Sequence, residues 1–311
     1  MRTIFLGNAQ RRDQWLQALR RFGRADLAAT VGSSDRAGSG NIPEFSSLQD
    51  ALAHTPAHLA IVSGCATAAA IDAAERGLAV ILEDPSSSGA AELRALRDAA
   101  ARRERAVTLV CATNRYARRA RLLRQFLTTG RLGAIGHVSC VDHRSSAGNA
   151  SSPEASTQLV SVGCGHLMSV QALVATRPLN VMAELTARSP QDVSTAAFVE
   201  LEQGVHIQYF GSVGSGPDHH ELWIEGTGGS LRTDGGNVLW RKRGWRFFVP
   251  LRFSLGRIGE DKDTARLAAL AKVETAGKAP ADSVDALALA SAAIQSNEMG
   301  CVVPLAGAVP R

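Results

Sequence analysis

The sequence predicts an α/β domain with a doubly wound parallel sheet, followed by an α+β domain with an open, mostly antiparallel sheet. Two observations predict this fold class. Residues 1–130 alternate short apolar runs with helix-like runs, which is typical of a parallel sheet with helices on both faces. Residues 131–311 contain a series of alternating polar and apolar segments, which is typical of an antiparallel sheet with one polar face. We therefore expect two domains with these bounds, with the last helix and strand able to pack back near the first domain.

Strands and helices are expected to alternate through the first domain. The apolar runs predict strands at residues 3–7, 26–32, 58–64, 78–83 and 106–112. The helix-like runs cover residues 11–22, 48–54, an Ala-rich run that ends at Gly77, 90–103 and 116–130. Glycine is common directly after a helix, so Gly77 and Gly130 support two of these helix ends.

The second domain is expected to begin with a half-exposed strand at residues 133–146. A loop rich in Ser, Ala and Gly then leads to a helix pattern at 158–175, and several β-like segments follow. Residues 241–250 predict an edge hairpin, because Lys and Arg are common guards of an exposed sheet edge. Two helix patterns, 261–277 and 282–299, precede a terminal strand.

Composition narrows the class of protein. Of the 311 residues, 45% are hydrophobic and 20% are charged, as in an ordinary globular protein. The net charge of +5 lies largely in helix-like runs, and no aromatic-interleaved basic motif accompanies it. We therefore expect solvated helix faces and no nucleic-acid partner. The same charge suits a small anionic ligand, including a phosphorylated cofactor.

Cysteine usage and hydropathy predict a cytoplasmic protein without a membrane segment. The five cysteines are scattered and have no C-x-x-C spacing, which favours reduced thiols over a disulfide or zinc framework. The chain enters an apolar strand at once, without a signal-peptide pattern. No apolar run approaches the ~20 residues that span a bilayer.

The carboxyl ends of the parallel strands are the expected ligand site, because open α/β sheets bind ligands there. The first strand is followed by Gly7, Asn8, Ala9 and Gln10. Of the pattern G-x-G-x-x-G only Gly7 fits, since Ala9 and Arg12 take the other two glycine positions; a plain strand–turn–helix explains the segment equally well.

The second strand is followed by Ser33, Ser34 and Arg36, a set that suits the 2′-phosphate of NADP better than the 2′-hydroxyl of NAD. A charged turn would look the same. We slightly favour NADP over NAD. The complete set of expected cofactor-binding residues is Gly7, Asn8, Ala9, Gln10, Ser33, Ser34, Arg36, Ser63, Gly64, Glu83 and Asn114.

Four segments, in order along nearly the whole chain, resemble the glucose-fructose oxidoreductase / inositol dehydrogenase (Gfo/Idh/MocA) family. They are Glu83-Asp84-Pro85, in place of the family's Glu-Lys-Pro, and residues 113–138, 222–234 and 290–305. The resemblance implies a Rossmann-type domain, an open-sheet domain, and hydride transfer between a nicotinamide and a carbinol or ketone, often of a sugar. It also implies a homodimer or homotetramer that assembles through the open sheet.

The resemblance implies His166 and Asp84 as the catalytic candidates. His166 stands at the family's histidine position, although a hydrogen-bonded core histidine is an equally good interpretation. Asp84 replaces the family's Lys, so an anion stands where a cation would stabilise an alkoxide. Arg115 and His143 are expected substrate contacts; for His143 a solvent-facing polar stretch is the competing interpretation.

No metal is expected. His219 and His220 stand beside Glu221, but alternation along a strand would point the two imidazoles to opposite faces. The favoured function is an NAD(P)-dependent oxidoreductase with an atypical active site, acting on a sugar, polyol or related carbonyl compound. The alternative is a family member without hydride transfer, either a binding or regulatory subunit or a non-redox enzyme that uses Asp84 or His166 as acid or base.

Overall fold

The chain folds into two compact units in a computed structural model. The first contains residues 1–114 and 261–288, and the second contains residues 115–260 and 289–311. The structure describes residues 1–32, 42–64, 67–83, 88–110, 123, 125–145, 176–189, 192–234, 237–251, 264–275 and 281–305. One sheet is parallel and the other is mostly antiparallel, which confirms the predicted fold class.

The first unit is built on a six-stranded parallel sheet with the order β3-β2-β1-β4-β5-β6. Its strands are β1 (Arg2–Gly7), β2 (Asp26–Val31), β3 (Glu44–Phe45), β4 (Leu59–Ser63), β5 (Ala79–Glu83) and β6 (Val107–Val110). Its helices are α1 (Ala9–Phe22), α2 (Leu48–His54), α3 (Thr67–Glu75), α4 (Ala90–Arg102) and α8 (Thr264–Thr275). The predicted strands are present, and β3 is an addition of two residues that has no signal of its own.

Helix α8 packs in the first unit, although it lies far beyond the predicted first domain in sequence. Leu270 and Val273 join a buried cluster with Trp15 of α1 and with Phe5 and Ile61 of the sheet. Helices α1 and α8 therefore cover the same face of the parallel sheet. Because helix packing depends on apolar contact rather than sequence distance, this placement is invisible in the local pattern of α8.

The second unit is a nine-stranded sheet with the order β14-β13-β12-β11-β7-β10-β9-β8-β15, in which only the β7–β10 pair is parallel. Its central strands are β7 (Ile135–Ser145), β8 (Pro178–Ser189), β9 (Asp192–Leu201), β10 (His206–Gly214) and β11 (His219–Gly226). The remaining strands are β12 (Gly229–Asp234), β13 (Asn237–Lys242), β14 (Val249–Pro250) and β15 (Val303–Pro304). The predicted edge hairpin is formed by β13 and β14.

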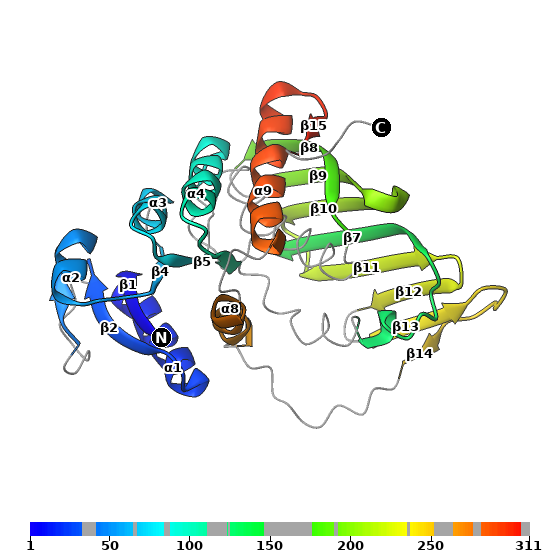
Figure 1. Ribbon diagram of the computed structural model, residues 1–311. Coiled ribbons are helices and arrows are strands. Elements are labelled where there is room, and N and C mark those ends of the chain that lie inside the picture. The colour runs from blue at the N-terminus through cyan, green and yellow to red at the C-terminus, as the bar shows by residue number, and fades with distance from the viewer. Residues whose placement is uncertain are drawn as a thin grey trace. The chain divides into compact units, whose positions relative to one another are not determined.

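One face of this sheet is covered and the other is open. Helix α9 (Ala281–Met299) runs across the sheet (Figure 1), and its Ser296 Oγ accepts a hydrogen bond of 3.0 Å from the Ala183 amide. On the opposite face Met182, Phe198 and Phe210 are 50%, 41% and 51% exposed. Period-two alternation of the strands separates these two sets of side chains.

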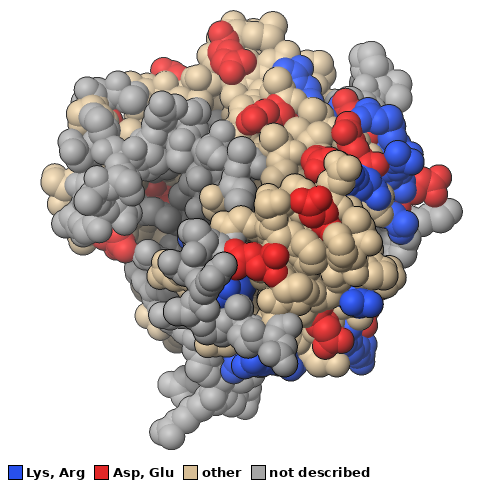
Figure 2. Space-filling view, turned by 90° about the vertical axis from the view of Figure 1, so that its left-hand side faces the viewer, with Lys and Arg blue, Asp and Glu red and all other residues tan. Residues whose placement is uncertain are grey.

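The described surface carries charges of both signs. Figure 2 shows acidic and basic side chains interspersed over the described residues of one face. Within the described part of the chain, no helix is long and apolar enough to cross a membrane.

Candidate functional site

The parallel sheet has a topological switch point between β1 and β4, where the chain changes the direction in which it builds the sheet. The order 3-2-1-4-5-6 places a ligand crevice at the carboxyl ends of these two strands in dinucleotide-binding folds. Gly7 ends β1 directly beside Ser63, which ends β4. A Cβ atom on Gly7 would lie 2.2 Å from the Ser63 carbonyl oxygen, and Gly7 has φ of 154°. Only glycine fits this position.

The switch point brings together four of the predicted cofactor-binding residues. Asn8 follows Gly7 and begins α1, where its Oδ1 accepts a hydrogen bond of 2.9 Å from the Arg11 amide. Gly64 follows Ser63 in a left-handed conformation with φ of 67°. A Cβ atom on Gly64 would lie 3.4 Å from the side-chain nitrogen Nδ2 of Asn8. Asn8 and Gly64 are exposed, whereas Gly7 and Ser63 are buried. Ala9 and Gln10, also predicted, form the first turn of α1.

Arg12 fills the third glycine position of the pattern and is fully buried. Its Nε donates to Oδ1 of the exposed Asp13 at 3.1 Å. A glycine at this position allows a helix to pack closely on the sheet. Here a long side chain occupies that space, so the segment matches the dinucleotide pattern at Gly7, has the small Ala9 at the second glycine position and departs from the pattern most at Arg12.

Glu83 ends β5 at the same edge of the sheet, and both of its carboxylate oxygens are engaged. Oε2 accepts hydrogen bonds from Trp15 Nε1, at 2.9 Å, and from Ser63 Oγ. Oε1 accepts from Arg266 Nη2 at 2.7 Å and from Arg266 Nε at 3.2 Å. Glu83 and Arg266 are 5% and 7% exposed. We call Glu83, Arg266, Trp15 and Ser63 the Glu83 clamp.

The clamp ties α8 to the carboxyl edge of the sheet. Arg266 Nη2 also donates to Gln14 Oε1 at 2.6 Å, and its guanidinium lies 5.5 Å from the centre of the Trp15 ring. Such stacking on an aromatic face adds to the ion pair. The carboxylate is thus saturated by protein donors. A direct role of Glu83 in cofactor binding stays a prediction, and its visible role is to fix the strand end that precedes Asp84.

His143 lies on the open face of the second sheet. Its Nδ1 is 2.8 Å from Ser212 Oγ on the neighbouring strand β10, and it shares this face with the exposed Phe210. The other predicted residues, Ser33, Ser34, Arg36, Asp84, Asn114, Arg115 and His166, lie outside the described residues. In the described part of the chain, no group of three or more His, Cys, Asp or Glu side chains is arranged to hold a metal ion.

Trp15 and Arg266 were not among the predicted site residues. Trp15 looks like a core position of an amphipathic helix, and its indole nitrogen is the only hint of a polar partner. Arg266 stands in a helix pattern 183 residues from Glu83. No local signal could have paired the two.

The strand order and the glycine at the switch point define a Rossmann-like α/β unit, joined in one chain to an open-sheet unit. No protein-family model matches the chain, and no curated protein matches it. Solved structures match it along nearly its whole length.

Levoglucosan dehydrogenase in complex with NADH is 14% identical, with a TM-score of 0.77 over 98% of this chain and 99% of that chain. An NAD-binding oxidoreductase from Klebsiella pneumoniae is 14% identical, with a TM-score of 0.76 over 100% and 99% of the two chains. An oxidoreductase from Agrobacterium radiobacter in complex with NAD+, L-tartaric acid and magnesium is 14% identical, with a TM-score of 0.73 over 99% of each chain. At this identity the likeness shows a common fold.

Proposed function

We propose that this chain is an NAD(P)-dependent oxidoreductase of the Gfo/Idh/MocA family with an atypical active site. The observation that carries the proposal is the switch point, where Gly7 and Ser63 end neighbouring strands and leave room for no side chain at Gly7. The four resembling segments support the family, and so does the likeness in fold to oxidoreductases that bind a nicotinamide cofactor.

The substrate proposed is a sugar, polyol or related carbonyl compound. Levoglucosan dehydrogenase has been solved with levoglucosan and with L-sorbose, and the Agrobacterium protein with L-tartaric acid. These three compounds share hydroxyl groups on adjacent carbons, so they form a rational first panel of substrates. The scattered cysteines, of which Cys140 and Cys301 are free thiols in the described part of the chain, support the expectation of a reducing, cytoplasmic location.

The described residues fit a dinucleotide in part. Gly7 and Ala9 leave the end of β1 uncrowded, and Asn8 and Gly64 are exposed beside it. A bound nicotinamide would supply or accept a hydride. Ser33, Ser34 and Arg36 would select NADP, and His166 with Asp84 would exchange the proton of the substrate oxygen.

We expect saturable binding of NADPH, tighter than that of NADH, because arginine recognises a phosphate by charge and by geometry. Fluorescence titration of the purified chain with each cofactor measures this directly. Oxidation of NADPH in the presence of L-sorbose, or reduction of NADP+ with levoglucosan or L-tartrate, then tests turnover. Absence of binding of both cofactors at millimolar concentration would contradict the proposal.

Two observations favour a member of the family that has lost hydride transfer. Arg12 is buried where the third glycine of the pattern would stand, and Asp84 replaces the family's Lys. Arg12 would weaken binding of the cofactor, and Asp84 would remove the cation that stabilises an alkoxide. The cofactor titration separates the two functions, since a binding or non-redox protein of this fold has no need of NADPH.

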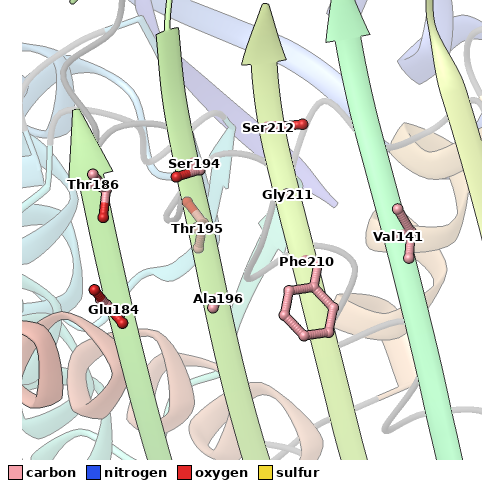
Figure 3. Close-up of a pocket in the computed structure, with 9 residues that line it drawn as sticks. All are labelled: Val141, Glu184, Thr186, Ser194, Thr195, Ala196, Phe210, Gly211 and Ser212. Atoms are coloured by element: carbon pink, nitrogen blue, oxygen red, sulfur yellow. The ribbon is translucent and has the colours of Figure 1, made fainter. Parts of the chain in front are cut away.

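We also propose that the chain assembles as a homodimer or homotetramer through the open sheet. Phe210 lies in a shallow hollow of about 370 Å³ on this face, which strands β7, β8, β9 and β10 line (Figure 3). The lining residues are Val141, Glu184, Thr186, Ser194, Thr195, Ala196, Phe210, Gly211 and Ser212. Exposed aromatic side chains next to small ones suit a self-complementary interface.

Replacing Phe210 with Asp is expected to shift the protein to monomers, because the carboxylate would lose its hydration in the interface. Light scattering after gel filtration measures the change in mass. Phe247→Asp is the matched control, since Phe247 is 72% exposed between β13 and β14. A Phe210→Asp variant with the mass of the wild type would speak against this interface.

A further inference from the structure

The connection between β13 and β14 carries a dense group of cations and aromatic rings. Residues 241–248, which we call the hairpin tip, read Arg-Lys-Arg-Gly-Trp-Arg-Phe-Phe. Four of these eight residues are cations, and no Asp or Glu occurs between residues 235 and 251. Residues 242–247 are all exposed, and the tip lies at the edge of the second sheet (Figure 1). The tip therefore presents positive charge without an acidic neighbour in sequence.

Two large apolar side chains stand among these cations. Phe247 is 72% exposed, the highest value among the described large apolar side chains, and Trp245 is 47% exposed. Single apolar side chains are common on protein surfaces, whereas several exposed at one place mark a binding surface. The combination of exposed rings and cations thus indicates a partner that is both anionic and apolar.

The rings are held in place by contacts within the hairpin. The Trp245 amide donates to the Lys242 carbonyl oxygen at 3.0 Å, and the centre of the Trp245 ring lies 5.5 Å from that of Trp240. The guanidinium of Arg241 lies 4.8 Å from the centre of the Phe248 ring. Because the tip is already ordered, little conformational freedom is lost when it binds.

A shallow hollow of about 300 Å³ lies beside the tip, and Arg241, Arg243 and Trp245 line it together with the turn between β11 and β12. Arg241 Nη2 donates to Ser230 Oγ at 3.3 Å, and Arg243 Nη1 donates to the Thr227 carbonyl oxygen at 3.4 Å. Both hydrogen bonds are long. Two guanidiniums in one hollow suit a phosphate or carboxylate group.

One carboxylate shares this hollow. Among the described lining residues only Glu225 is acidic, and its Oε1 accepts a hydrogen bond of 2.8 Å from Trp223 Nε1. Four cations and one carboxylate leave the tip and the hollow with a charge of +3. The surface as a whole therefore attracts anions.

We propose that the hairpin tip docks reversibly on an anionic lipid bilayer. Trp245 and Phe247 enter the headgroup region, where aromatic rings are favoured, and the cations lie over acidic headgroups. Each Lys or Arg close to such a surface strengthens binding about fivefold. The two guanidiniums of the hollow bind a headgroup phosphate.

The size of the tip and the contacts of its rings favour a lipid surface over a macromolecular partner. A stable protein interface takes about 20–30 residues from each side, whereas the tip has eight. Nucleic-acid bases stack on the faces of aromatic rings, but Arg246 already lies 5.8 Å from the centre of the Phe247 ring. A bilayer requires only that a small apolar wedge with positive flanks can enter it.

Docking of the tip is compatible with the proposed assembly and location. Strands β11 and β12 lie between β13 and the strands that line the hollow around Phe210. The tip is therefore separate from the surface proposed for assembly. Acidic lipids face the cytoplasm, so reversible docking also agrees with a cytoplasmic protein.

Co-sedimentation of the full chain with vesicles tests the docking. We expect binding to vesicles of phosphatidylcholine with about one third phosphatidylserine, and none to phosphatidylcholine alone. Binding is expected to weaken as the ionic strength rises from about 0.1 M to about 1 M, because the screening length falls from about 10 Å to about 3 Å. Equal binding to both kinds of vesicle, or binding to neither, would overturn the proposal.

Two variants of the tip separate the charge from the apolar contact. Lys242→Gln/Arg246→Gln is expected to weaken binding to the acidic vesicles about 25-fold, which is about fivefold for each cation. Phe247→Ser is expected to weaken it about tenfold or more, because the phenyl ring no longer leaves water.

Matched controls remove the same kinds of side chain elsewhere. Arg103→Gln/Arg105→Gln removes two exposed cations of the first unit, and Val302→Ser removes an apolar side chain that is 55% exposed. Both are expected to bind the vesicles as the wild type does. Tip variants that bind as tightly as these controls would contradict the docking.

Tryptophan fluorescence tests whether the tip enters the bilayer. We expect acidic vesicles with brominated acyl chains to quench the wild type, and Trp245→Phe to abolish this quenching. Quenching that persists in Trp245→Phe would show that another part of the chain enters the lipid. A single-stranded RNA oligomer that binds more tightly than the vesicles, and loses affinity in Phe247→Ser, would assign the tip to nucleic acid instead.

Discussion

Replacing Arg266 with Met is expected to destabilise the first unit by about 3–5 kcal/mol, because it removes the cation that hydrogen bonds to the buried Glu83. Among the described side chains only Arg11, whose Nη1 lies 3.7 Å from Glu83 Oε1, then remains as a cation beside this carboxylate. Glu83→Gln is expected to cost a similar amount by stranding the guanidinium of Arg266. The reason is geometric, since Arg266 donates twice to the same carboxylate oxygen and both side chains are under 10% exposed. The expected fall in melting temperature is about 10 °C, measured by circular dichroism.

The double variant Glu83→Gln/Arg266→Met sharpens the test. It removes both charges, so it is expected to be less destabilised than the sum of the single variants, as for contacting residues in one network. Arg24→Met is the matched control, because Arg24 pairs with Glu274 of α8 at 3.2 Å while 72% exposed. Exposed pairs contribute about 0–1 kcal/mol. An Arg266→Met variant as stable as Arg24→Met would contradict the role of the clamp.

Replacing Gly7 with Ala is expected to abolish NADPH binding and to lower stability as well. The new methyl group would lie 2.2 Å from the Ser63 carbonyl oxygen, so β1 and β4 must separate at the switch point. The backbone conformation of Gly7 adds a strain of about 1–3 kcal/mol for any other residue. Fluorescence titration with NADPH and thermal unfolding measure the two effects.

Gly23→Ala separates backbone strain from the site. Gly23 ends α1 with φ of 70°, and a Cβ atom there meets nothing within 4 Å. The Gly23→Ala variant is expected to lose about 1 kcal/mol of stability, and its affinity for NADPH is expected to equal that of the wild type. If Gly7→Ala binds NADPH as well as Gly23→Ala does, the cofactor does not depend on the end of β1.

The sheet of the first unit could be predicted because each of its longer strands is a continuous apolar run followed by a helix-like run. β3 could not, since two residues carry no period. The sequence predicts Glu83 as a site residue at the end of β5, but its partners Trp15 and Arg266 lie 68 and 183 residues away. Contacts at such separations follow from packing and leave no local pattern.

The second sheet shows the same division. Alternation predicts that His219 and His220 face opposite sides, and the structure agrees. Which side is covered depends on where α9 packs, and this decides that His143 lies on the open face while Asp142 is buried. The sequence predicts His143 as a site residue, whereas its neighbour Asp142 is the residue whose side chain is buried.

The position of α8 has a consequence for how the protein is made. The first unit cannot close its core, or pair Glu83 with Arg266, until the ribosome has added 183 further residues. At about 5–20 residues per second this delay is roughly 10–40 s. During that interval the nascent first unit carries an uncovered apolar face and a Glu83 carboxylate that lacks its Arg266 partner. A chain that ends at residue 130 would lack α8 and keep this face of the sheet uncovered. The first unit therefore needs two segments that are far apart in the chain, residues 1–114 and 261–288.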